Sequence, residues 1–389
     1  MAGKSSDQRR ATDALYASMT SVFEAAGAEF IEPDILQPAD VFLERSGEHI
    51  RSRTYVFTDP SGAELCLRPD LTVPACRYHL EHAGDVAAPA RYCYAGKAFR
   101  HSTQAGNSPV REFDQIGLEI FGTGNSARDD AEVLALTLSA LKAANVAEYK
   151  IELGDLGLFN ALLASLDMPD RWRTRLKRQF WRPRAFRDLL NQLSGKTQKQ
   201  RTSISTLLDE MAASDLDAVG FVEQRIEALE LEMIAGRTVE QVAGRLSEKL
   251  LDRSDPPLSP EQAELIDHYL SIRSAPAEAL AQLQQIAAAT NGAFTEAVET
   301  FAARIEAMKA AGLAVDCMEF AAVFGRSLEY YTGFVFQIDL PSPDGSTRNI
   351  AGGGRYDTML ADIGAPDMIP AVGSAIHASR LLLPGQVVT

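Results

Sequence analysis

The chain of 389 residues carries 53 acidic and 38 basic side chains, which give a formal net charge of −15, and 46% of its residues are hydrophobic. This composition is typical of a soluble globular protein with two or three domains and excludes a disordered or fibrous chain. No run approaches the ~18 apolar residues of a membrane span, and the polar N-terminus has no signal-peptide pattern. We therefore expect a cytoplasmic protein, with neither a membrane nor, given its negative charge, a nucleic acid as partner.

The cysteines and histidines do not suggest metal or covalent chemistry. The four cysteines lack the C-x-x-C spacing of a zinc or redox site, and a disulfide framework is not expected at this chain length. We interpret them as thiols of the core: Cys66, Cys76, Cys93 and Cys317. No Ser/His/Asp or Cys/His arrangement is visible, so we expect no catalytic residue, no metal and no cofactor.

The N-terminal region predicts a helix followed by a short extended segment. Apolar residues recur at three- and four-residue steps: Leu15, Met19, Val22, Phe23 and Ala26. Gly27 is suited to end this helix. The extended run 30–36 contains Pro33, and a proline in a strand belongs at an edge or an interface.

Four further runs predict strands. Residues 55–58 and 64–67 flank a Pro-Ser-Gly turn and predict a hairpin. The longer runs 91–100 and 113–122 alternate with period two and predict a second antiparallel pair. The connection between them, 101–112, is longer than a usual hairpin loop, which is common where a loop covers a ligand.

The second pair predicts a sheet with one apolar and one polar face. Alternation separates Gln115 and Glu119 from the apolar residues of the same strand, which are Ile116, Leu118 and Ile120. On the neighbouring strand the same rule gathers Tyr92, Tyr94, Gly96, Ala98 and Arg100. A face with this many specific polar groups is too polar for packing, and we interpret it as the floor of a ligand site.

Helical patterns dominate the middle of the chain. A helix begins near Asp129, and 149–153 returns to strand alternation, which favours an α+β fold. From about 170 to 312 the stripes are helical. Within this region, 171–201 holds 11 Lys or Arg residues and one acid, Asp188. Such a stretch either binds an anion or an acidic partner or is simply a solvated helix face.

Strand patterns resume at the C-terminus. Residues 318–324 are apolar, and 331–340 alternate. Tyr330 and Tyr331 are expected on opposite sides of a strand, so at most one points into a pocket and the other lies in the core. The glycine-dense segment 350–357, expected between a strand and a helix, lacks the phosphate-loop motif and favours close backbone packing or approach to a ligand.

Several motifs resemble those of histidyl-tRNA synthetase. The segments similar to its histidine-recognition motifs are Leu67–Thr72, Phe113–Glu119, Arg326–Gly333 and Ala351–Asp357. Pro33 resembles the class II motif 1 proline, Phe99-Arg100 motif 2, and Gly373–Arg380 motif 3. The resemblance implies a class II synthetase-like antiparallel sheet flanked by helices, with a helical insertion. The expected division is 1–168 and 313–389 for the core and 169–312 for the insertion.

Other positions depart from the synthetase pattern. Ser102 stands where motif 2 has a glutamate, and His377 and Ser379 replace the glycine and glutamate of motif 3. These changes fall on the ATP side of a synthetase site. Only nine residues follow Arg380, so we expect no anticodon-binding domain. This combination resembles the regulatory subunits of ATP phosphoribosyltransferase.

That resemblance implies a function in histidine biosynthesis. Members of this family lack aminoacylation activity, join a short-form catalytic subunit in a glycosyltransferase complex for the first step of the pathway, and transmit feedback inhibition by L-histidine. It also implies a homodimer within a hetero-oligomer, with Pro33 at the dimer interface. The alternative is an ATP-dependent enzyme that forms histidyl-adenylate for a carrier other than tRNA.

The resemblance assigns the histidine-binding residues one by one. Glu119 and Asp70 are expected at the ammonium group, with neutral hydrogen bonds from nearby side chains, and Arg100 at the carboxylate. A tyrosine hydroxyl can donate to or accept from an imidazole nitrogen. The full expected set is Asp70, Thr72, Arg100, Gln115, Glu119, Arg326, Tyr330 and Tyr331.

Overall fold

A computed structural model describes most of the chain: residues 3–43, 52–101, 111–196, 203–229, 238–290, 292–325, 330–341 and 346–381. The chain divides into two compact units. The core unit comprises Met1–Ser165 and Tyr269–Thr389, and the insertion unit comprises Leu166–His268. No helix among the described residues is long and apolar enough to cross a membrane.

The core unit combines helices with two sheets. Its helices are α1 (Ser6–Ala25), α2 (Ala39–Leu43), α4 (Thr72–His82), α5 (Ser126–Ala143), α6 (Leu156–Ser165), α13 (Pro276–Ala289), α14 (Ala293–Ala310), α15 (Met359–Asp362), α16 (Ala378–Leu381) and the 3-10 turn η1 (Val315–Cys317). Its strands are β1 (Glu29–Phe30), β2 (Leu36–Pro38), β3 (Tyr55–Thr58), β4 (Glu64–Leu67), β5 (Ala90–Phe99), β6 (Glu112–Phe121), β7 (Lys150–Asp155), β8 (Arg273–Ser274), β9 (Glu319–Ala321), β10 (Phe334–Pro341), β11 (Thr347–Arg355) and β12 (Ala371–His377).

Nine of the strands in the described residues form one sheet in the order β1-β5-β6-β12-β11-β10-β7-β9-β8. Most pairs are antiparallel, and β1 with β5 and β7 with β9 are parallel. The predicted α+β class is confirmed. The predicted hairpin is confirmed as well, because β3 and β4 pair antiparallel in a small sheet with β2. The glycine-dense segment proves to lie mostly inside β11, between β10 and β12.

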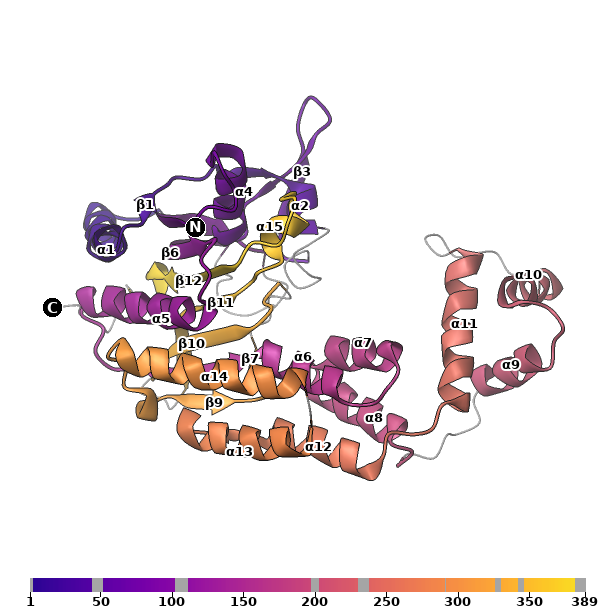
Figure 1. The fold of residues 1–389 in the computed structure, drawn as a ribbon. Coiled ribbons are helices and arrows are strands. Elements are labelled where there is room, and N and C mark those ends of the chain that lie inside the picture. The colour runs from indigo at the N-terminus through magenta and orange to yellow at the C-terminus, as the bar shows by residue number, and fades with distance from the viewer. Residues whose placement is uncertain are drawn as a thin grey trace. The chain divides into compact units, whose positions relative to one another are not determined.

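The two faces of the large sheet differ as the alternation predicts. Helix α5 contacts β6, β11 and β12 and itself packs against α1 and α14, whereas α4 also contacts β6 and packs with α15 (Figure 1). In the register, Glu119 of β6 stands opposite Tyr92 of β5 and Gly373 of β12. Gln115 stands opposite Gly96 and His377. The polar positions of three neighbouring strands therefore share one face.

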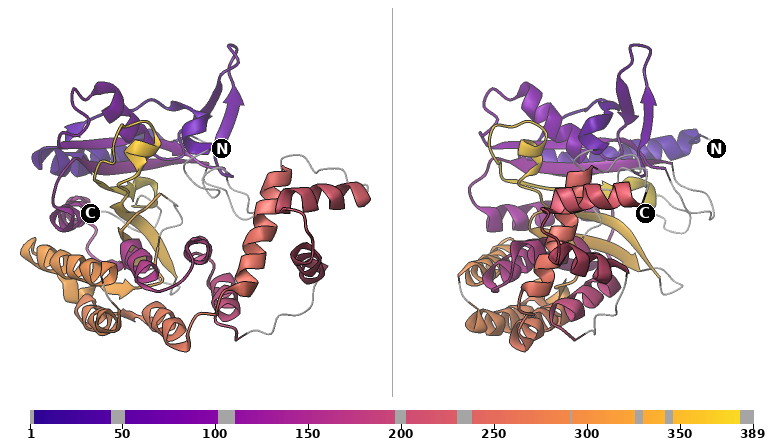
Figure 2. Two further views of the ribbon diagram at one scale, coloured as in Figure 1. Left: turned by 45° about the vertical axis from the view of Figure 1, so that its right-hand side comes forward. Right: turned by 90° about the vertical axis from the view of Figure 1, so that its right-hand side faces the viewer.

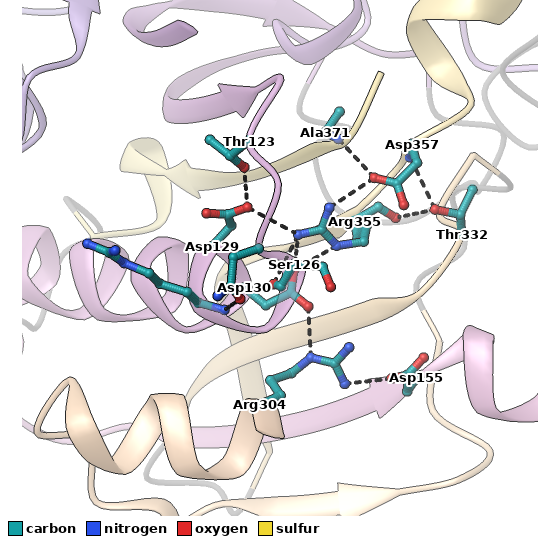
Figure 3. Close-up of polar contacts among 12 residues, drawn as sticks. Thr123, Ser126, Asp129, Asp130, Asp155, Arg304, Thr332, Arg355, Asp357 and Ala371 are labelled. Atoms are coloured by element: carbon teal, nitrogen blue, oxygen red, sulfur yellow. Dashed lines mark hydrogen bonds and ion pairs between the residues drawn. The ribbon is translucent and has the colours of Figure 1, made fainter. Parts of the chain in front are cut away.

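A buried ion network joins the helices on one face of the sheet to the strands (Figure 3). Arg304 of α14 donates from Nε to Asp130 Oδ2 of α5 at 2.7 Å and from Nη1 to Asp155 Oδ2 at 2.6 Å. Arg355 of β11 donates from Nε to Asp130 Oδ1 at 2.9 Å. All four side chains are at most 7% exposed. Burial raises the pKa of Asp130, and the two arginines oppose this shift.

The same network explains where the insertion unit ends. The expected insertion, 169–312, includes α13 and α14, yet both belong to the core unit. Helix α14 packs against α5 and α6, and its apolar stripe, from Val298 to Met308, is buried. Arg304 lies within that stripe and fixes α14 to the strands through Asp155.

The insertion unit is helical. Its helices are α7 (Asp170–Gln179), α8 (Pro183–Leu193), α9 (Ser203–Ala212), α10 (Ala218–Ala228), α11 (Val239–Ser254) and the start of α12 (Pro260–Ser271). In both views of Figure 2, α9, α10 and α11 lie together, and their small core includes Met211, Phe221, Val222 and Ala243. Trp172 of α7 is buried and donates to Asp252 of α11 at 2.5 Å.

Three of the four cysteines fit the prediction. Cys66, Cys76 and Cys93 are buried, and burial raises the pKa of each thiol. The prediction is wrong for Cys317, which is exposed. It closes the 3-10 turn η1, where of the three residues only Val315 is buried.

We predict that Arg304→Met lowers the free energy of unfolding by about 3–5 kcal/mol, because it leaves Asp130 and Asp155 buried without their shared partner. Denaturant unfolding of the purified protein measures this loss. The control is Arg273→Met, whose side chain is 51% exposed and pairs with Glu152 and Glu319 at the surface. It is expected to cost less than ~1 kcal/mol, and equal losses for the two variants would contradict the network's role.

Candidate functional site

A cavity of about 380 Å³ opens on the polar face of the large sheet, within the core unit. Its floor comes from β6, β11 and β12, and its walls from the segment before α4, the end of β5 and the segment before β10. Its size is within the range of small-molecule sites. The described residues that line it are Arg53, Pro69, Asp70, Thr72, Arg100, Gln115, Gly325, Tyr330, Tyr331, Gln337, Asn349, Gly352, Tyr356, Gly373, Ser374, Ala375, His377 and Arg380.

Glu119 lies beneath this floor and is fully buried. Tyr94 donates to its Oε1 at 2.7 Å, and the Tyr356 hydroxyl donates to its Oε2. Burial raises the pKa of Glu119 to about 7, although these hydrogen bonds favour the ionised form. Two glycines make the arrangement possible, because a Cβ at Gly117 would collide with the Tyr94 phenol and one at Gly373 with the Glu119 carboxylate.

Asp70 offers a buried acceptor at the cavity wall. It is 3% exposed, and its Oδ1 accepts from the backbone N–H of Val73 at 3.3 Å, at the start of α4. Among the described residues, Oδ2 has no hydrogen-bond partner. Burial raises the pKa of Asp70, and the charge of Arg100 opposes the shift. A buried carboxylate oxygen without a donor is costly, so this atom suits a ligand donor such as an ammonium group.

Thr72 and Gln115 line the cavity and are linked through Tyr94. Thr72 Oγ1 lies 3.4 Å from the Tyr94 hydroxyl, and Gln115 Nε2 donates to the same hydroxyl at 3.4 Å. Tyr94 in turn donates to Glu119. The three predicted polar residues around this tyrosine therefore form one hydrogen-bonded group.

Arginines also line the cavity. Arg100 donates from Nε to the carbonyl of Pro69 at 2.7 Å, and its guanidinium lies 5.2 Å from the centre of the Phe113 ring. Arg53 and Arg380 also line the cavity. This gives the cavity cationic groups in addition to the carboxylate of Asp70.

Both tyrosines before β10 line the cavity, so the expectation that they face opposite sides is wrong. Their ring centres lie 4.7 Å apart. The reason is that they precede β10 in a turn rather than lying in a strand. The backbone N–H of Thr332 donates to the carbonyl of Arg355 at 2.8 Å and fixes this turn to β11. Arg326, predicted from the same motif, lies outside the described residues.

The cavity is also lined by residues outside the predicted set. Tyr356 lies in the glycine-dense motif, but nothing in the motif indicates that its hydroxyl reaches Glu119. Gln337 alternates with Phe336 and Ile338, so strand periodicity indicates that it lies on the polar face. No sequence pattern indicates that Arg53 lies at the cavity.

Pro33 is buried within the protomer, and exposed apolar side chains occur in the segments near it. The buried Arg68 donates to the Pro33 carbonyl and, from Nε, to the carbonyl of Lys97 at 2.7 Å. Large apolar side chains near it in sequence, and on the β3 strand, are 40–50% exposed: Phe30, Ile35, Leu36, Val56 and Phe57. We call these five residues the apolar surface.

The arrangement suits a small ligand with charges of both signs. Asp70, backed by the buried Glu119, can accept from an ammonium group, and Arg100 can donate to a carboxylate. Thr72, Gln115 and the two tyrosines add neutral donors and acceptors. The chemistry of these groups is that of an α-amino-acid site, and the residue assignments remain predictions.

The sequence of this chain is similar to a known family and to curated proteins. A family model described as histidyl-tRNA synthetase matches residues 5–218 and 183–381. The ATP phosphoribosyltransferase regulatory subunit of Mesorhizobium japonicum is 36% identical over 95% of this chain and 96% of its own length. That of Brucella anthropi is 34% identical over 98% of each chain.

A solved structure has the same fold. It is an ATP phosphoribosyltransferase regulatory subunit/histidyl-tRNA synthetase from Bacillus halodurans. It superposes with a TM-score of 0.67 at 22% identity and covers 98% of this chain and 80% of that one. The predicted class II synthetase-like fold is thereby confirmed.

We predict that Glu119 makes the protein less stable as pH rises from ~4.5 to ~7. Its pKa is 4.5 when unperturbed and about 7 in the fold, so in this window the folded chain holds a proton that the unfolded chain releases. The loss is roughly 3 kcal/mol and levels off above pH 7. Denaturant unfolding at pH 5, 6, 7 and 8 should show this loss in the wild type and not in Glu119→Gln.

The control for this prediction is Glu112→Gln, on the same strand but exposed. It should keep the wild-type pH dependence. If Glu119→Gln and the wild type lost stability in parallel across the window, the proposed titration of Glu119 would be refuted.

Proposed function

The chain belongs to the family of ATP phosphoribosyltransferase regulatory subunits, which share the fold of histidyl-tRNA synthetase, and from this premise we propose its function. It is the non-catalytic subunit of a glycosyltransferase complex that carries out the first step of histidine biosynthesis. It joins a short-form catalytic subunit and transmits feedback inhibition by L-histidine. The observation that carries this proposal is identity of 34–36% with such subunits over nearly the whole chain.

The cavity supports histidine as the effector. The ammonium group would bind Asp70 Oδ2, which has no donor among the described residues. The carboxylate would bind Arg100, and the imidazole would lie toward Tyr330 and Tyr331. The motif resemblance adds Arg326 to this set. Thr72, Gln115 and Glu119 would support the site through Tyr94.

Two motif 3 positions support a non-catalytic role. Ser379 is used for packing, since its Oγ accepts from the backbone N–H of Asp114 at 2.7 Å and donates to Asp114 Oδ2 at 3.0 Å. His377 lines the cavity with its ring 5.4 Å from Phe113. Neither side chain supplies the carboxylate or the open space that the synthetase motif offers a nucleotide.

Feedback inhibition requires more than histidine binding. Histidine must bind the inhibited and active assemblies with different affinities, because equal affinity shifts no equilibrium. Typical coupling free energies of ~1–3 kcal/mol change the affinity 5- to 150-fold. The effector must therefore shift the preference of this chain for one state of its complex with the catalytic subunit.

We predict that this protein stimulates phosphoribosyl-ATP formation by the short-form catalytic subunit of the same organism, and that histidine reverses the stimulation. Asp70→Asn should raise the half-inhibitory histidine concentration at least tenfold, because the ammonium group loses its charged partner. Stimulation without histidine should persist. The assay is product formation across a histidine titration.

The matched control is Asp316→Asn, which changes an exposed aspartate of the same unit. It should inhibit like the wild type. Absence of stimulation by the wild type would refute the proposed function, whereas wild-type inhibition of Asp70→Asn would refute only the histidine site.

An adenylate-forming enzyme is the second candidate. It is favoured by one observation, that Arg100 and Arg380 both line the cavity where a synthetase would hold phosphates. Such an enzyme would catalyse histidine-dependent exchange of pyrophosphate into ATP. Exchange by the isolated chain, together with no effect on the catalytic subunit, would favour this candidate.

The apolar surface supports a homodimer. Strand β1, which carries Phe30, is an edge strand of the large sheet, and an exposed edge beside apolar side chains favours pairing with a second chain. We predict that Phe30→Asp/Leu36→Asp yields monomers in sedimentation velocity, where the wild type is a dimer. Val323→Asp, near the opposite edge of the sheet and also exposed, should remain dimeric; a dimeric double variant would contradict the interface.

A further inference from the structure

The described part of the predicted basic stretch, 171–196, covers α7, α8, the turn between them and three residues after α8, within the insertion unit, while 197–201 lie outside the described residues. Figure 1 shows the two helices next to each other. Residues 171–196 carry nine Lys or Arg residues and a single acid, Asp188. Eight of these nine cations, all except Lys196, fall into two groups with different surroundings.

The first group is neutralised by ion pairs within the unit. Arg171 donates from Nε to Asp252 Oδ1 at 2.9 Å and pairs with Asp255. Arg175 pairs with the same Asp252. Arg173 pairs with Asp170 at 2.5 Å and donates to the carbonyl of Leu166. These arginines are explained by the fold of the unit.

The second group faces outward. It consists of five exposed residues around the turn, which we call the basic surface: Lys177, Arg178, Arg182, Arg184 and Arg187. Among the described residues, none of the five forms an ion pair. The buried side of α8 is occupied by Phe186, Leu189 and Leu190, so the helix needs no charge on its outer side for folding. Clustered like charges repel one another and destabilise a fold, so we expect a negatively charged partner to bind here.

An aromatic side chain lies in the same turn as part of the basic surface. Trp181 is half-buried in the turn, and its ring meets the buried Phe180 edge-on, with ring centres 5.2 Å apart. Tryptophan and arginine are the residues most enriched at the energetic centres of protein interfaces. Four of the five cations are arginines, whose planar guanidinium groups bind carboxylates through two hydrogen bonds.

We propose that the basic surface docks a carboxylate-rich face of the catalytic subunit, an inference that rests on the proposed function. The surface places five cations on α7, α8 and the turn that carries Trp181, in a chain of net charge −15. An acidic protein face gains attraction there, while the negative charge of the remaining chain limits contact to this surface and sets the orientation of docking. A nucleic acid fits less well, because its extended phosphate backbone would also meet that remaining charge.

The test uses the full chain and the purified short-form catalytic subunit of the same organism. The variant is Arg184→Glu/Arg187→Glu, and the control is Arg245→Glu/Lys249→Glu, which changes the charge equally at exposed positions of α11 in the same unit. The dissociation constant is measured by biolayer interferometry at 50, 150 and 300 mM salt. The variant should bind at least tenfold more weakly at 50 mM salt, with a flatter salt dependence, and the control less than threefold more weakly.

Every other outcome overturns the proposal, and the outcomes distinguish failure of the basic surface from failure of the proposed function. Wild-type binding by the Arg184→Glu/Arg187→Glu variant, or equal weakening in the control, refutes the basic surface and leaves the proposed function intact. No binding by the wild-type chain refutes the proposed function and the docking surface together. Salt-sensitive binding of a mixed-sequence RNA that only this variant loses, with binding of the catalytic subunit unchanged, would assign the surface to nucleic acid. Thermal melts of all three proteins should coincide, because the substituted side chains are exposed.

Discussion

The core unit depends on the burial of Asp130 between two arginines. Arg304 and Arg355 come from segments far apart in sequence, and neither can move alone, because an unpaired charge in this position costs several kcal/mol. The network continues to the cavity. Arg355 donates to Asp357 at 3.0 Å, and Asp357 accepts from the backbone N–H of Ala371 at the start of β12. The pairing that holds α5 and α14 to the sheet therefore also fixes the strands that form the cavity floor (Figure 3).

The sequence predicted those parts of the fold in which apolar and polar residues alternate between two different environments. The strands around 91–100 and 113–122 alternate because one face packs on α5 and the other lies toward α4 and the cavity. A helical stripe carries no such information about its partner, so periodicity alone places α14 in the insertion. Arg304 within that stripe indicates otherwise, since an arginine among buried apolar residues needs carboxylates nearby. Likewise, the glycine-dense segment 350–357 was expected between a strand and a helix, although pairing with β10 and β12 holds most of it inside a strand.

The candidate site was predictable where motif and alternation agree. Gln115 and Glu119 share a face by periodicity, and the structure brings them together through Tyr94. The sequence does not show how deeply a side chain on this face is buried. Glu119 lies below the floor because Gly117 leaves room for the Tyr94 ring and Gly373 leaves room for the Glu119 carboxylate. This arrangement depends on three neighbouring strands at once. The contact of the Tyr356 hydroxyl with Glu119 also depends on how the strands pair, and the spacing of residues along the chain does not predict it.

The two buried acids, Asp70 and Glu119, suggest how ligand binding at the cavity affects other parts of the core unit. The floor itself has little freedom, because β6 is paired with β5 and β12 over most of its length. Burial raises the pKa of both Asp70 and Glu119, so the ammonium group proposed to bind Asp70 would compete with protonation of these acids and favour their ionised forms. Ionised Glu119 then accepts more strongly from Tyr94 and Tyr356. Both tyrosines belong to the core cluster that includes residues of α4 and α15, so a change in ligand charge alters hydrogen bonding inside that core rather than only at the cavity wall.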